Sequence, residues 1–155
     1  MKLRLLAVGT RMPGWVEEGV ATYRKRLPRD FALEVEEIAP ARRGKNTPAD
    51  RAREQEARRI GERLKGDEHL VALEVTGKPW TTRQLSRQAE DWRMQGRDVA
   101  LLVGGPDGLD PALSARAQSA WSLSPLTLPH PLVRVILAEQ LYRAWTLMVG
   151  HPYHR

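Results

Sequence analysis

The sequence predicts a single α/β domain built on a mainly parallel sheet. Segments of strand-like composition alternate with segments of helical periodicity along the whole chain, which is typical of this class. One apolar run, Val99–Val103, has no polar member, as expected for a strand covered on both faces. The length of 155 residues fits one hydrophobic core, so residues 1–155 are expected to form one domain.

The first half of the chain is expected to hold two strands and two helices. Apolar spacing and helix-breaking residues predict strands at Lys2–Val8 and Phe31–Ile38, and helices from Pro13 to about Leu27 and from Ala49 to Leu64. For the second helix we expect Thr47 as the N-cap and Pro48 at the first helical position. Residues 39–48, with two prolines, three basic residues and no apolar periodicity, are expected to form an exposed loop.

The second half is expected to continue the alternation and to end in a helix. The predicted elements are strands at His69–Val75 and Asp98–Val103, helices from Thr81 or Thr82 to about Gln95 and from Asp110-Pro111 to about Ser119, an extended segment at Trp121–Leu128, and a last helix at Pro131–Val149. Gly77-Lys78-Pro79 predicts a turn after the third strand, and Gly96 predicts a left-handed helix end.

Composition excludes several functional classes. The chain has no cysteine, which excludes disulfides and thiolate metal sites. No apolar run approaches the roughly 20 residues of a membrane-spanning helix, and the apolar N-terminal stretch is too short and too interrupted for a signal peptide. We therefore expect a cytoplasmic protein without membrane contact. We expect no metal site either, because the two tail histidines have no acidic residue close in sequence.

The excess of basic residues is confined to the first part of the chain. Residues 1–65 hold 16 Lys and Arg against 10 Asp and Glu, whereas residues 66–155 hold 9 of each. A basic lobe beside a neutral lobe indicates a polyanion partner, most often a nucleic acid. A solvated arginine-rich surface explains the same charge equally well.

A glycine-rich turn follows the most apolar of the predicted strands. Gly104-Gly105-Pro106-Asp107-Gly108 comes directly after that strand, and in open α/β sheets ligands bind beyond the carboxyl ends of strands. Glycine there lets a ligand approach the backbone closely. The turn matches neither GxGxxG nor the Walker pattern, so dinucleotide and triphosphate binding are poorly supported. A tight turn without a ligand is the alternative.

Residues 121–131 form a stretch stiffened by three prolines. Extended backbone leaves N–H and C=O groups for a ligand, and the three leucines of the stretch are suited to flank a flat aromatic group such as adenine. The alternative is a structural connector whose leucines fill the core.

The last predicted helix is apolar nearly all the way round, which indicates burial. Either other segments of the chain wrap it or it forms a dimer interface. Arg134, Glu139 and Arg143 are its polar exceptions, and the simplest interpretation of the last two is an i, i+4 salt bridge. The tail that follows, His151-Pro152-Tyr153-His154-Arg155, either frays or provides groups that stack on a base, contact phosphate and move protons.

These segments together resemble one family. The carrying motifs are Val103–Gly108, Trp121–Ser124, Leu126–Arg134, Glu139–Trp145 and His151–Arg155, together with Met1–Leu3, Ala7–Thr10, Met12-Pro13 and Arg43–Asn46. The chain resembles the RlmH (YbeA-type) family of the SPOUT superfamily, which are bacterial large-subunit ribosomal RNA pseudouridine N3-methyltransferases. The similarity runs end to end and is least specific over residues 47–68.

The resemblance implies a fold, an assembly and a reaction. It implies a SPOUT fold with a deep C-terminal trefoil knot, which also explains an all-round apolar last helix, although knots are rare. It implies a homodimer that transfers a methyl group from S-adenosyl-L-methionine (SAM) to N3 of a pseudouridine in 23S ribosomal RNA, on assembled ribosomes. The residues that it places at SAM are Leu73, Gly104, Leu123, Ser124, Pro125, Leu126, Thr127 and Leu128.

Basic and titratable residues are the candidates for the reaction itself. The candidate catalytic residues are His130, Arg134, Tyr153, His154 and Arg155, and the candidate RNA-binding residues are Arg42, Arg43, Lys45 and Arg143. We expect a histidine to take the proton of the ring nitrogen, an arginine to favour the deprotonated imide, and the tyrosine to orient the base. The alternatives are a SPOUT enzyme acting on transfer RNA and a non-catalytic ribosome-binding factor.

Overall fold

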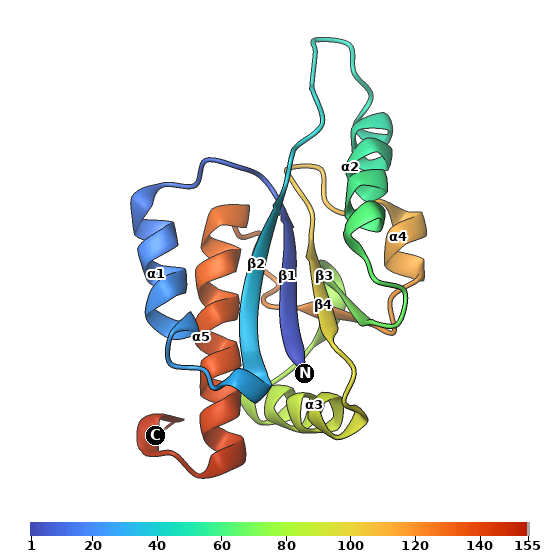
Figure 1. Ribbon diagram of the computed structural model, residues 1–155. Coiled ribbons are helices and arrows are strands. Elements are labelled where there is room, and N and C mark those ends of the chain that lie inside the picture. Colours follow the sequence, from blue (N-terminus) through green and yellow to red (C-terminus); the bar gives the residue numbers. More distant parts are fainter. Residues whose placement is uncertain (155) are drawn as a thin grey trace.

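The computed structural model describes residues 1–154 as one five-stranded sheet with helices on both faces (Figure 1). All strand pairs are parallel, and the strand order is β2-β1-β4-β3-β5. The strands are β1 (Lys2–Val8), β2 (Ala32–Ile38), β3 (His69–Pro79), β4 (Val99–Val103) and β5 (Ser119–Ser122). The helices are α1 (Gly14–Arg24), α2 (Ala49–Arg63), α3 (Thr82–Gln95), α4 (Pro111–Ala115) and α5 (His130–Val149), with short 3-10 helices η1 (Arg29–Phe31) and η2 (Pro152–His154). The predicted α/β class with a mainly parallel sheet and the predicted element order are confirmed.

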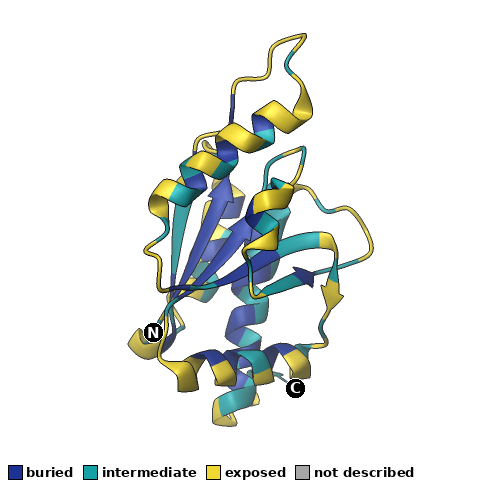
Figure 2. Cartoon of the chain, turned by 90° about the vertical axis from the view of Figure 1, so that its right-hand side faces the viewer, coloured by how far each residue is buried: buried dark blue, intermediate teal, exposed yellow. Residues whose placement is uncertain are grey.

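Alternating side chains of the sheet separate two hydrophobic cores. Leu3 and Leu5 of β1 belong to the core under α1, α3 and α5, whereas Leu6 and Val8 belong to the core under α2 and α4. Figure 2 shows the strands buried between helices whose outer faces are exposed. β4 is buried at all five positions, which confirms the interpretation of its continuous apolar run.

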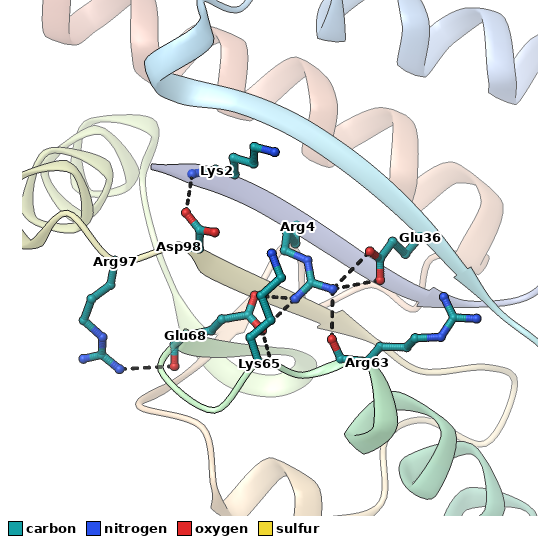
Figure 3. A network of polar contacts seen from close by, with 8 residues as sticks. All are labelled: Lys2, Arg4, Glu36, Arg63, Lys65, Glu68, Arg97 and Asp98. Atoms are coloured by element: carbon teal, nitrogen blue, oxygen red, sulfur yellow. Dashed lines mark hydrogen bonds and ion pairs between the residues drawn. The ribbon is translucent and has the colours of Figure 1, made fainter.

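A polar network lies within the second core (Figure 3). Arg4 of β1 is only 3% exposed and donates hydrogen bonds to Glu68, at 2.6 Å, and to Glu36, at 2.9 and 3.0 Å. It also donates to the backbone oxygen of Arg63 at the end of α2, at 2.9 Å. The backbone N–H of Lys65 donates to Glu68. One buried cation therefore fastens the segment between α2 and β3 to the sheet.

Two of the three predicted helix-end residues are confirmed. Thr81 caps α3 in a reciprocal capping box with Gln84, and Gly96 ends α3 in the left-handed conformation. The prediction for Thr47 is wrong, because the N-cap of α2 is Pro48 and no side chain caps this end. The Thr47 hydroxyl instead accepts a hydrogen bond from the N–H of Gly44, at 3.0 Å. A local turn therefore competes successfully with helix capping for this hydroxyl.

The predicted turn at residues 77–79 is wrong, because β3 continues to Pro79. The strand has an irregularity between Leu73 and Lys78, beyond which it pairs with β5 again. A Cβ at Gly77 would lie 2.7 Å from the backbone of Ala120. The glycine at position 77 is therefore required by the close approach of β3 and β5, and it does not mark a turn.

The segment before the last helix is less extended than predicted. Helix α4 ends at Ala115, earlier than expected, and only residues 119–122 of the following stretch form a strand. Residues 123–129 connect β5 to α5 as a loop. Helix α5 packs against α1 and α3, while several apolar residues on its other faces stay half-exposed. Among residues 1–154, no helix has the length and apolar character needed to cross a membrane.

Candidate functional site

A pocket of about 590 Å³ lies beyond the carboxyl end of β4, beside residues 73–76 of β3 and the end of β5. Three chain segments line it: the second half of β3 from Leu73 to Thr76, the turn after β4, and the stretch from Trp121 to Val133. This is the edge of a parallel sheet at which α/β proteins usually bind ligands. Its volume falls in the range of small-molecule sites.

The turn after β4 is built so that only glycine fits at its first position. A Cβ at Gly104 would overlap the backbone of Gly108, so a side chain at Gly104 would force the turn open. Gly108 has a φ of +79° and donates its N–H to the backbone oxygen of Gly105, at 3.0 Å. The turn thereby folds back on itself and leaves the pocket open above it.

The structure brings most of the predicted cofactor residues together. Leu73, Gly104 and residues 123, 124, 126, 127 and 128 all line the pocket, and Pro125 does not. Leu126 is 71% exposed and forms part of the rim. The Ser124 hydroxyl accepts from the N–H of Leu126, at 2.9 Å, and shapes the loop. Residues separated by 50 positions in sequence thus form one cavity.

His130 reaches the same pocket from the first turn of α5. Its buried Nδ1 atom has no hydrogen-bond partner among residues 1–154. Burial lowers the pKa of His130 below 6.5, and the charge of Arg134 lowers it further. The imidazole is therefore neutral at pH 7 and can accept a proton.

Arg134 lies behind the pocket wall. It is 3% exposed and donates to the backbone oxygen of Gly9, at 2.8 Å, and to Glu37, at 2.6 Å. These contacts join the start of α5 to the ends of β1 and β2. Arg134 holds α5 and His130 in place and does not line the pocket.

The tail is separated from the pocket within one chain. Tyr153 packs against Tyr142, with ring centroids 4.6 Å apart, and lies 5.0 Å from the guanidinium of Arg143. Its hydroxyl donates to Glu139, at 3.2 Å, and burial followed by the charge of Glu139 raises the pKa of Tyr153 to about 12. On a helix that rises 1.5 Å per residue, Tyr142 is about 18 Å from His130.

The fold therefore does not unite the predicted catalytic residues around one pocket. His154 belongs to η2 beside Tyr153, at the opposite end of α5 from His130. Arg155 lies outside the described residues. The predicted salt bridge between Glu139 and Arg143 is confirmed, with the two side chains 3.1 Å apart.

The predicted RNA-binding residues fall into two places. Arg42 and Lys45 are exposed in the loop that projects from the top of the molecule in Figure 1. Arg43 of the same loop turns inward and pairs with Glu56 and Asp107. Arg143 lies on α5, beside the tail.

Sequence reasoning missed three polar or aromatic residues of the pocket. Glu74 and Thr76 line it because β3 continues past Val75, where a turn had been expected nearby. Glu74 accepts a hydrogen bond from the hydroxyl of Ser114. Trp121 forms a wall and stacks on Trp80, with centroids 5.1 Å apart. No sequence signal identifies Glu74 or Thr76, because their position depends on the pairing of β3 with β5.

Comparison with known proteins gives a full-length match. A family model described as a predicted SPOUT methyltransferase matches residues 1–154. The ribosomal RNA large subunit methyltransferase H of Chromohalobacter salexigens is 62% identical over 155 residues, covering 100% of both chains. The protein of the same name from Hahella chejuensis is 61% identical and that from Pseudomonas aeruginosa 54%, each over the whole of this chain and at least 99% of the relative.

More distant solved structures share the fold. A probable methyltransferase from Bordetella pertussis has a TM-score of 0.57 at 19% identity, covering 92% of this chain and 95% of that one. TrmJ from Z. mobilis has a TM-score of 0.53 at 18% identity, covering 97% of this chain and 76% of that one. At these identities the likeness concerns the fold alone.

Proposed function

Because the chain belongs to the SPOUT methyltransferase family, we propose that it transfers a methyl group from SAM to ribosomal RNA of the large subunit. The observation that carries this proposal is the 62% identity, from end to end, with a ribosomal RNA large subunit methyltransferase H. The finer assignment, N3 of a pseudouridine in 23S ribosomal RNA on assembled ribosomes, rests on the motifs of the pocket loops and the tail.

The residues of the pocket fit SAM. Leucines at 123, 126 and 128 provide apolar surface for a flat ring, and Glu74, Thr76 and Thr127 offer polar groups for hydroxyl and charged substituents. The backbone of Gly104 permits close approach. His130 lines the same cavity. We therefore assign SAM to this pocket, with Pro125 shaping the loop from outside.

The chain's own residues would align and deprotonate the base. When bound, SAM supplies an electrophilic methyl group. A ring nitrogen must lose its proton to attack that group, and His130, which lines the pocket and whose pKa is lowered by burial, would accept that proton. An arginine near the base, either Arg143 of α5 or Arg155 of the tail, would favour the deprotonated imide. Tyr153 would orient the base. Arg42 and Lys45 would contact phosphate.

We further propose that the active unit is a homodimer. Within one chain, Tyr153 and His154 lie far along α5 from the pocket, so a second copy is needed to bring a tail to the base. The half-exposed apolar residues of α5 offer a surface for that second copy. The knot and a cytoplasmic location belong to the same proposal. A knot accords with α5 leaving the β5 edge of the sheet and packing against α1, near the opposite edge.

Methylation of purified substrates tests the proposal. With SAM labelled in its methyl group, label should enter assembled ribosomes, and mass mapping of their RNA should place it on a pseudouridine. Alanine at His154 or Arg155 should abolish transfer and leave SAM affinity unchanged. Equal labelling of transfer RNA would favour the transfer RNA alternative. Absence of SAM binding in calorimetry would contradict the methyltransferase assignment and favour a binding factor.

A further inference from the structure

A buried carboxylate and a loop arginine connect the projecting loop to the turn that lines the pocket. Glu56 of α2 is 2% exposed, and its Oε2 atom accepts from the N–H of Ala41, at 3.0 Å. It also pairs with the guanidinium of Arg43, at 3.0 Å. The same carboxylate lies 3.5 Å from where a Cβ of Gly105 would be. Glu56 thus lies against both the loop and the turn.

Arg43 extends this connection to the turn itself. Its Nε atom donates to Asp107, at 2.8 Å, and Asp107 lies between Pro106 and Gly108 of the turn. The hydrogen bond with Asp107 raises the pKa of Arg43, so the guanidinium stays charged at all ordinary pH values. Arg53 of α2 also donates to the backbone oxygen of Asp107, at 3.3 Å.

Arg43 thus donates to two carboxylates of the chain, and it also donates to the backbone oxygen of Ala41, at 3.3 Å. Its neighbours in the loop, Arg42 and Lys45, have no such internal ion pairs in residues 1–154 and are exposed. Two of the N–H groups of Arg43 already donate to carboxylates, so a phosphate would compete with two charge-assisted hydrogen bonds, each stronger than a neutral one.

We propose that Arg43 is a positioning residue for the pocket: through Asp107 and Glu56 it holds the turn of residues 104–108 against α2 and thereby raises the affinity for SAM. This role rests on the proposed function of the pocket and replaces RNA contact as the role of Arg43. The turn is the only part of the pocket lining, among residues 1–154, that is held by an ion pair to the projecting loop.

Calorimetry with SAM, without RNA present, tests the affinity. Arg43→Ala and Asp107→Asn should each weaken SAM binding roughly tenfold, which lies within the usual range for coupling between sites. The double variant should bind no more weakly than Arg43→Ala alone, because Arg43→Ala already removes the interaction with Asp107. The matched control is Arg58→Ala, which removes an exposed arginine of the neighbouring helix α2. This variant should bind SAM as the wild type does. Arg43→Lys should recover part of the loss.

A second readout separates this role from a general loss of stability. Hydrogen exchange of the segment 104–109 in the ligand-free protein should accelerate in Arg43→Ala and stay unchanged in Arg58→Ala, at equal melting temperatures of both variants. Wild-type SAM affinity in Arg43→Ala, or unchanged exchange of that segment, would overturn the proposal. Failure of the wild type to bind SAM would count against the proposed function, and the exchange experiment would then still decide whether Arg43 holds the turn.

Discussion

Arg4 shows how a charged side chain is accommodated in a strand of this sheet. Burial lowers the pKa of Arg4, but hydrogen bonds and the charges of Glu68 and Glu36 outweigh it and raise the pKa overall. The guanidinium is therefore charged and depends on its partners. Removing Glu68 would take away two short hydrogen bonds and leave this buried charge with Glu36 as its remaining carboxylate partner.

We therefore predict that Glu68→Ala destabilises the protein by about 3 kcal/mol, the usual cost of breaking a buried ion pair. Glu34→Ala is the matched control, since it removes an exposed pair with Lys2 and should change the stability far less. Urea unfolding followed by circular dichroism measures both. Equal, small effects of the two substitutions would mean that Arg4 finds water or another partner when Glu68 is removed.

His130 gives a pH dependence with a definite sign. Because its pKa is lowered from 6.5 in the folded protein, the unfolded chain binds more protons just below pH 6.5. The stabilisation is thus complete above pH 6.5 and is lost as the pH falls toward the folded pKa. We predict that His130→Gln loses less stability than the wild type between pH 7.5 and 5.5, as measured by urea unfolding at both values.

His69 supplies a comparison for the same experiment. Burial, and then the charge of Arg97, also lowers the pKa of His69, so part of the pH dependence should survive in His130→Gln. A pH dependence identical to that of the wild type would show that His130 titrates normally. It would also remove the physical reason for assigning the proton acceptor to this side chain.

At the scale of elements, the pocket depends on the turn after β4 and on the paired strands β3 and β5, which tolerate only glycine at positions 104 and 77. A Cβ at Gly104 meets the backbone of Gly108, and one at Gly77 meets the backbone of Ala120. Neither neighbour is a flexible side chain that could move aside. The elements that shape the pocket are therefore constrained by backbone contact.

We predict that Gly104→Ala abolishes detectable SAM binding, because the turn of residues 104–108 must open to make room for the alanine side chain. The matched control is Gly61→Ala in helix α2, where a Cβ meets nothing within 4 Å. That control should bind SAM normally and gain roughly 0.5–1 kcal/mol of stability, because alanine is favoured over glycine inside a helix. Calorimetry and thermal unfolding measure the two effects, and SAM binding by Gly104→Ala at wild-type affinity would contradict the role of the turn.

At the scale of the whole molecule, α5 separates two groups of candidate functional residues. His130 and the pocket lie at its first turn, and Tyr153 packs beside residues 139–143. Within one chain, the pocket and Tyr153 are therefore too far apart along α5 to contact the same base. The proposed dimer resolves this by joining the pocket of one copy to the tail of another.

Mixing inactive variants tests that arrangement. Gly104→Ala and Tyr153→Ala should each be inactive alone. When the two variants are mixed, random pairing makes about half of the dimers mixed, and each mixed dimer has one intact site out of two. The mixture should therefore show about a quarter of the wild-type activity. A mixture of Tyr153→Ala and His154→Ala should stay inactive, because no intact tail is present. An inactive first mixture, with subunit exchange verified, would mean that each tail serves its own pocket.

Sequence by itself determined the α/β class, the element order and most of the residues that proved to line one pocket. Apolar periodicity, the continuous run of β4 and the glycines at 96 and 104 report local backbone requirements, and these are written into neighbouring residues. The basic excess and the motifs also pointed to a nucleic acid methyltransferase. Such signals are short-range, so they survive without knowledge of the fold.

Tertiary structure decided what depends on distant partners. The extension of β3 past Val75 follows from pairing with β5, and that pairing places Glu74 in the pocket. Arg43 proved to pair with Glu56 and Asp107, although it lies in the same exposed loop as Arg42 and Lys45. Tyr153 proved to lie along α5, away from His130. The physical reason is the same in each case: a side chain's role follows from the groups that the fold brings to it, and those groups are far away in the sequence.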